Sequence, residues 1–208
     1  MFEIKQPSKI ILGKHSALKI DFPNNCLLIT SKGAYKRGWI EYINLKNYSI
    51  FDQVENNPSI ETAEKIISEF SRHNISSIIG IGGGSVLDVA KYCGYKMNKN
   101  KILIPTTFGS GSEVTRISVL KINNKKQSFH DDRLLADTAI IDSSFIYNTP
   151  EKILNNSFID ALAQCSEGYD SKLANVYTRF LCEKAFYYLE KGIENNEYEN
   201  IVMGSLLS

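Results

Sequence analysis

Short apolar runs alternate with helix-like stripes along the first two thirds of the chain. The runs predict strands at residues 26–30, 48–51, 77–81, 101–104 and 138–141. Between them, apolar residues recur at helical spacing after Asn57-Pro58, where we expect a helix to open, and again after three consecutive glycines. Strands that alternate with helices predict parallel βαβ units, which bind ligands at the carboxyl ends of their strands.

The pattern changes at Pro150, after which only helical stripes are found. We therefore predict an α/β domain with a parallel sheet over residues 1–149. The start of an all-helical domain follows over residues 150–208. A length of 208 residues lies between one domain and two, at roughly 150 residues per domain.

The charge and composition of the chain limit the classes of partner that we expect it to bind. The chain has 24 Lys+Arg against 23 Asp+Glu, a net charge of +1, without the basic excess that nucleic-acid or membrane-surface binding needs. No apolar run approaches the roughly 18 residues of a spanning helix, and residues 1–10 lack the apolar core of a secretory signal. We expect a cytoplasmic protein with no nucleic-acid or membrane partner. The four cysteines (26, 93, 165 and 182) form no CxxC pair and are expected in the core.

Three glycines stand where a strand is expected to give way to a helix. Gly82, Gly83 and Gly84 precede Ser85 and Asp88. Such a turn lets backbone N–H groups approach a phosphate, which the helix N-terminus also attracts. The alternative is a tight turn with a structural capping box made by Ser85 and Asp88.

Two further groups of residues are candidates. Thr106 and Thr107 lie in a Ser/Thr/Gly loop after the strand at 101–104 and suit a nucleotide, although such a loop also satisfies its own backbone. Asp160 and Gln164 are four residues apart and share a helix face, so both can reach one metal ion. Two ligands are too few for a metal site, and the pair alone favours a surface contact.

Taken in order, the motifs resemble the iron-containing (group III) alcohol dehydrogenase family. They are GGGSVLDVAK, IPTTFGSGSEVT, LLADTAIIDSS and IDALAQCSEGYDSKLAN, and VENNPSIETAEKI before them is similar to the family's Asn-Pro segment. The resemblance runs from about residue 10 to the last residue. It implies a dinucleotide-binding parallel-sheet domain, an incomplete helical metal domain as in dehydroquinate synthases, and a chain truncated at its C-terminus.

The resemblance also implies roles for residues. Gly82, Gly83, Gly84 and Ser85 would hold the pyrophosphate of NAD or NADP, and Asp88 would stabilise the turn or touch the nicotinamide half. The adenosine side and phosphates would be contacted by Thr106, Thr107 and Ser112, and Lys126 would be the family's cofactor-contacting lysine. Asp160 takes the first ligand position for Fe²⁺ or Zn²⁺, and Gln164 the next. The implied reaction is hydride exchange between a small alcohol or aldehyde and the nicotinamide, in a monomer or homo-oligomer.

The chain departs from the family pattern at three places. Gln164 stands where the family has histidine, as in a branch that resembles phosphonoacetaldehyde reductases; an amide binds Fe²⁺ or Zn²⁺ less strongly than imidazole. The segment Ser31-Lys32-Gly33 stands where an acidic residue often binds the ribose. The missing carboxylate and the charge of Lys32, which could pair with a 2′-phosphate, favour tolerance of NADP. By the resemblance, we expect the remaining ligand histidines, and the histidine that assists proton release, at positions beyond Ser208.

The three histidines present are not expected to bind metal: His15 lies in a predicted turn, His73 at a helix end and His130 in a predicted loop. Two hypotheses therefore stay open, a dehydrogenase and an inactive fragment or nucleotide-binding remnant. A lyase similar to dehydroquinate synthase is a more distant third. For the chain as it stands, we expect weak dinucleotide binding and negligible turnover of alcohols.

Overall fold

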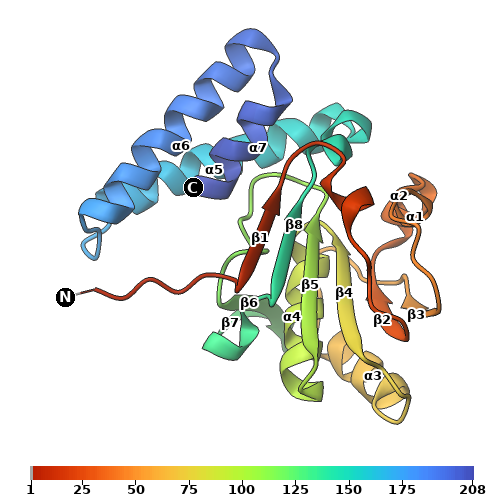
Figure 1. The fold of residues 1–208 in the computed structure, drawn as a ribbon. Coiled ribbons are helices and arrows are strands. Elements are labelled where there is room, and N and C mark those ends of the chain that lie inside the picture. Colours follow the sequence, from red (N-terminus) through yellow and green to blue (C-terminus); the bar gives the residue numbers. More distant parts are fainter. Residues whose placement is uncertain (1) are drawn as a thin grey trace. The chain divides into compact units, whose positions relative to one another are not determined.

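The computed structural model describes residues 2–208, and its first compact unit is built on a six-stranded parallel sheet. The strand order is β1-β8-β5-β4-β2-β3, and every neighbouring pair is parallel (Figure 1). The strands are β1 Lys9–Leu12, β2 Cys26–Ile29, β3 Tyr48–Phe51, β4 Ser77–Gly82, β5 Asn100–Pro105 and β8 Thr138–Ile141. The predicted α/β class is confirmed, and β1 is a strand that the apolar pattern did not predict.

Helices α3 (Ile60–Phe70) and α4 (Gly84–Met97) cover the sheet and bury their apolar stripes in one core with β2, β4 and β5. Helix α3 begins two residues later than predicted, because the Ser59 hydroxyl accepts a hydrogen bond from the Thr62 N–H and makes Ser59 the N-cap. The short helices α1 (Lys32–Lys36) and α2 (Trp39–Tyr42) follow β2. Within residues 2–208, the 3₁₀ turns are η1 (Ser16–Lys19), η2 (Asp132–Leu134) and η3 (Ser143–Asn148).

A hairpin that the sequence analysis missed follows β5. Strands β6 (Ile117–Ile122) and β7 (Lys125–His130) pair antiparallel. Asn123 and Asn124 connect them with φ angles of 50° and 60°, the left-handed conformation of a two-residue type I′ turn. His130 is thus the last residue of a strand rather than part of a loop.

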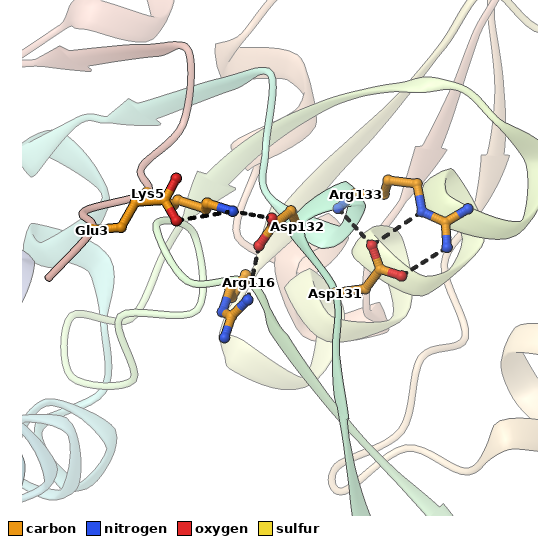
Figure 2. Close-up of polar contacts among 6 residues, drawn as sticks. All are labelled: Glu3, Lys5, Arg116, Asp131, Asp132 and Arg133. Atoms are coloured by element: carbon orange, nitrogen blue, oxygen red, sulfur yellow. Dashed lines mark hydrogen bonds and ion pairs between the residues drawn. The ribbon is translucent and has the colours of Figure 1, made fainter. Parts of the chain in front are cut away.

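Ion pairs tie the N-terminal segment to the turn after the hairpin (Figure 2). Lys5 donates to the Asp132 carboxylate, which also accepts from Arg116 Nη1 at 2.8 Å. Beside it, the Arg133 guanidinium holds the pKa of Asp131 at about 2, through hydrogen bonds of 2.7 and 3.0 Å to its two carboxylate oxygens. These contacts fix the chain on both sides of the hairpin.

The second compact unit contains residues 106–111 and 143–208, and the first unit contains the rest. Its helices are α5 (Glu151–Asp170), α6 (Val176–Asn195) and α7 (Tyr198–Leu207). The Asn175 side chain caps α6 by accepting from the Tyr177 and Thr178 N–H groups. The predicted domain boundary at Thr149-Pro150 stays a prediction; the compact units divide after Asp142, and the second takes the 106–111 loop from between β5 and β6.

All four cysteines are buried, as the sequence analysis expected, and their thiols are free. Burial raises the pKa of every one of these thiols, to about 11 for Cys165. Over residues 2–208, no helix has the combined length and apolar character needed to cross a membrane.

Candidate functional site

The glycine turn lies at the carboxyl end of β4. Gly82 is the last residue of the strand, Gly83 is the N-cap of α4, and Gly84 begins the helix. A Cβ on Gly82 would lie 2.7 Å from the Val86 Cβ, so only glycine lets the strand pass this close to the first turn of the helix. The first N–H groups of a helix have no intrahelical acceptor, and no side chain caps α4. The turn therefore presents backbone donors and the positive end of a 14-residue helix.

The capping box of Ser85 and Asp88, which was the alternative for this turn, is not formed. The helix begins before Ser85, so the Ser85 hydroxyl is too far along the helix to act as an N-cap. Instead its Oγ accepts from the Asn57 N–H at 3.2 Å. Asn57 has a left-handed φ of 51° and belongs to the segment that leads into α3. Ser85 thus joins this segment to the glycine turn, a contact that the sequence analysis did not identify.

The side chain of Asp88 contacts β6 and the segment that leads into it. One carboxylate oxygen accepts from Ser112 Oγ at 2.7 Å, and the other accepts from the Val119 N–H at 3.1 Å. Its backbone carbonyl accepts from Ser118 Oγ at 2.9 Å. The structure therefore brings two predicted site residues, Asp88 and Ser112, into direct contact behind the glycine turn.

Lys91 completes this contact and was missed by the sequence analysis. Its ammonium is fully buried, lies 3.1 Å from the Asp88 carboxylate, and donates to the backbone carbonyls of Ser112, at 2.8 Å, and Ile117. Burial lowers the pKa of Lys91, and the Asp88 carboxylate opposes that shift. Lys91 follows Asp88 by one helical turn, and this spacing was the signal available in the sequence.

Glu113 is the second carboxyl group near Lys91. It is only 3% exposed, and burial raises its pKa to about 7, while Lys91 acts in the opposite direction. A carboxyl that titrates near neutrality directly after Ser112 makes the packing of this segment against α4 dependent on pH.

The loop that carries Thr106 and Thr107 belongs to the second compact unit. Thr106 is buried, and its carbonyl accepts from Thr149 Oγ1 at 3.3 Å. A Cβ on Gly109 would lie 2.2 Å from the Ser157 carbonyl oxygen, so the loop backbone lies directly against α5. Within the same unit, Gln164 Nε2 donates to the Gly109 carbonyl at 2.9 Å.

The predicted metal pair lies on α5. Asp160 is exposed and Gln164 is half-buried, with its amide nitrogen on the loop. No group of three or more His, Cys, Asp or Glu side chains able to hold a metal ion is present within residues 2–208. Two oxygen donors, one of them on a side chain bound to the loop, do not fit Fe²⁺ or Zn²⁺ by themselves.

The remaining predicted residues are spread over the first unit. Lys126 is exposed on β7, and Lys32 is exposed at the start of α1, three residues after the end of β2. His73 lies beyond the end of α3 with its ring edge-on to Phe70. His15 adopts a left-handed φ of 60° in the turn after β1.

Asp142, at the carboxyl end of β8, is a fully buried carboxylate that the sequence analysis did not single out. It accepts from the His15 and Ala17 N–H groups at 2.8 and 3.1 Å and from the Tyr42 hydroxyl at 3.1 Å. These bonds fix the turn after β1 at the carboxyl edge of the sheet, the edge at which open α/β sheets generally bind ligands.

Comparison with known proteins agrees with this architecture. The chain is 35% identical to 4-hydroxybutyrate dehydrogenase of Clostridium kluyveri over 176 residues, which are 71% of this chain and 47% of that protein. It is 34% identical to long-chain-alcohol dehydrogenase 1 of Geobacillus thermodenitrificans over 172 residues, 70% of this chain and 44% of that protein. The chain thus spans about half the length of these curated relatives.

Solved structures share the fold. A 1,3-propanediol oxidoreductase superposes with a TM-score of 0.92 at 24% identity, over all of this chain and 65% of that one. A sulfoacetaldehyde reductase from Bifidobacterium kashiwanohense, solved in complex with NAD⁺, gives a TM-score of 0.90 at 23% identity over all of this chain and 65% of that chain. The family model of iron-containing alcohol dehydrogenases matches residues 7–143, from before β1 to just past β8. The chain belongs to the iron-containing alcohol dehydrogenase family.

Proposed function

We propose that this chain forms the nicotinamide-dinucleotide-binding part of an oxidoreductase that interconverts a small alcohol and its aldehyde. The observation that carries the proposal is the glycine turn, where β4 ends against an uncapped α4 in a parallel sheet. Backbone donors and the helix dipole converge there on a place suited to a pyrophosphate. The bound nicotinamide would supply or accept the hydride.

The residues of the chain would bind and orient the cofactor. Gly82, Gly83, Gly84 and Ser85 would hold the pyrophosphate through their backbone. In this proposal Asp88 positions the turn, because its carboxylate is already bound to Ser112, Val119 and Lys91.

The contacts with the rest of the cofactor are proposed from the family. Thr106, Thr107, Ser112 and Lys126 would contact the adenosine side and phosphates. Lys32 is exposed after β2 and would tolerate the 2′-phosphate of NADP.

A charge placed at the helix N-terminus tests the proposal. Ser85→Asp keeps an oxygen that accepts from the Asn57 N–H and interacts favourably with the helix dipole, so we expect the melting temperature to be unchanged or raised. The same carboxylate would repel a pyrophosphate and weaken NADH binding by at least about tenfold, or 1.4 kcal/mol. NADH fluorescence titration measures this change.

Asn175→Asp is the matched control, because it adds the same charge at the N-cap of α6. We expect wild-type NADH binding in this variant. Equal NADH affinity in Ser85→Asp and in the wild type would place the dinucleotide elsewhere and overturn the proposal.

We propose small alcohols and aldehydes as the substrate class. Phosphonoacetaldehyde is one specific substrate that we propose within this class. Asp160 is the metal ligand we propose from the family, for Fe²⁺ or Zn²⁺ in the loaded enzyme. A panel of aldehydes with NADH or NADPH, read by the loss of reduced cofactor, tests the substrate class. Loss of cofactor with phosphonoacetaldehyde but not with uncharged aldehydes of similar size would support the sub-hypothesis.

A nucleotide-binding protein without turnover is the second candidate. This candidate is favoured because residues 2–208 contain no group of three or more His, Cys, Asp or Glu side chains that could hold a metal ion. For the 208-residue chain we expect negligible alcohol oxidation even with added Fe²⁺ or Zn²⁺. Steady-state turnover by the purified chain would eliminate this candidate.

A further inference from the structure

Among the contacts of the loop at residues 106–111, three join it to the rest of its own compact unit. At one end of the loop, the Thr149 hydroxyl lies 3.3 Å from the Thr106 carbonyl and 3.0 Å from the Phe145 carbonyl, and these two acceptors share its one proton. In the middle, the missing side chain of Gly109 lets the backbone lie against the Ser157 carbonyl. The third contact is the hydrogen bond from Gln164 Nε2 to the Gly109 carbonyl, at 2.9 Å.

The Gln164 amide has a defined orientation at this loop. A carbonyl oxygen only accepts hydrogen bonds, so the amide nitrogen must face Gly109. The amide oxygen then lies on the side of Gly111, where an added Cβ would be 4.0 Å from Oε1. Both polar atoms of the side chain are therefore directed at the loop.

We propose that Gln164 is a positioning residue that clamps the 106–111 loop to α5, and that it is not a metal ligand. One hydrogen bond from a half-buried side chain holds the loop backbone next to the two threonines that the proposed function assigns to the cofactor; this part of the inference rests on that function. The amide suits the clamp because it donates to an acceptor-only carbonyl, whereas its oxygen is a weak ligand for Fe²⁺ or Zn²⁺.

Two substitutions separate the clamp from a metal ligand. Gln164→Glu keeps the shape and an oxygen ligand but replaces the donor with a carboxylate that repels the Gly109 carbonyl. Gln164→Met keeps the length and removes both functions. Asn155→Asp, at an exposed position of α5, controls for the added charge.

Hydrogen–deuterium exchange of the 106–111 peptide measures the clamp directly. We expect amide exchange to accelerate about 3- to 10-fold in both Gln164 variants, as for the loss of one hydrogen bond, and to stay unchanged in Asn155→Asp. NADH affinity should fall in the same two variants. Metal content per chain, measured by mass spectrometry after incubation with Fe²⁺ or Zn²⁺, should be equal in the wild type and Gln164→Met.

Two results would overturn the inference. One is wild-type exchange of the loop in Gln164→Glu. The other is metal content that falls in Gln164→Met but is kept in Gln164→Glu. If the wild type binds neither NADH nor NADPH, the proposed function fails, while the exchange rates still decide whether Gln164 clamps the loop.

Discussion

The buried ammonium of Lys91 gives the sharpest test of how α4 and its glycine turn are held. Lys91→Met keeps the length and the apolar stem but removes the charge. The side chain is 0% exposed and that of its partner Asp88 is 14% exposed, so the substitution leaves a nearly buried carboxylate without its cation. The carbonyls of Ser112 and Ile117 also lose their donor. Breaking a buried pair in this way costs about 3–5 kcal/mol, a large part of the roughly 5–15 kcal/mol that stabilises a domain.

Urea unfolding followed by the fluorescence of Trp39 measures this loss, because the chain has a single tryptophan and it is buried in the first unit. Lys101→Met is the matched control. Lys101 lies 3.3 Å from an Asp137 carboxylate that is 43% exposed and that keeps its bond from the Lys101 N–H. We expect a loss of about 1 kcal/mol or less there. Equal losses in the two variants, both near 1 kcal/mol, would refute the reasoning about Lys91.

Three further predictions concern the same unit. The pKa of Glu113 is raised from 4.5 to about 7, so the folded state binds the proton of this carboxyl more tightly than the unfolded state does. The resulting contribution to the free energy of unfolding is fully present below about pH 4.5 and is lost as the pH rises through 7. The free energy of unfolding should therefore fall by about 3 kcal/mol between pH 4.5 and pH 8 in the wild type, and this fall should be absent in Glu113→Gln. The same dependence of the unfolding free energy on pH in both proteins would contradict the argument that burial raises the pKa of Glu113. Lys32→Ala should weaken NADPH binding about 2- to 5-fold and leave NADH binding unchanged in fluorescence titrations; equal effects on both cofactors would exclude contact with the 2′-phosphate. Gly82→Ala forces a Cβ to within 2.7 Å of Val86 and should cost about 1–3 kcal/mol in thermal unfolding, whereas wild-type stability would show that the turn has room.

The apolar pattern predicted the strands that are most buried: β2 and β4 are buried at every position, and β8, which has the predicted bounds, is buried at three of its four positions. Strand β3 also has the predicted bounds, although it lies at an edge of the sheet and only one of its residues is buried. Strand β1 escaped detection because three of its four residues are exposed at the edge of the sheet. The hairpin was not predicted for the same reason, because almost all of β7 is exposed and polar. A pattern of apolar residues indicates which segments are buried, and β1 and β7 have few buried residues.

The chemistry of the site was only partly predictable. The glycines indicated a turn from strand to helix, but not that the helix begins at Gly84 with Gly83 as its N-cap, which leaves Ser85 inside the first turn. A lysine between apolar helix residues is typical of a solvent-exposed face, so Lys91 was missed. Its burial follows from the hairpin that covers α4, which the pattern did not predict. The orientation of Gln164 likewise depends on a loop 55 residues earlier in the chain.

The most direct test of the central claim is hydrogen–deuterium exchange of the wild-type chain with and without saturating NADH. Binding at the glycine turn predicts slower exchange in peptides that cover residues 82–88, where the amides at the start of α4 would donate to the pyrophosphate. Unchanged exchange in those peptides, with protection only in other parts of the chain, would contradict the account.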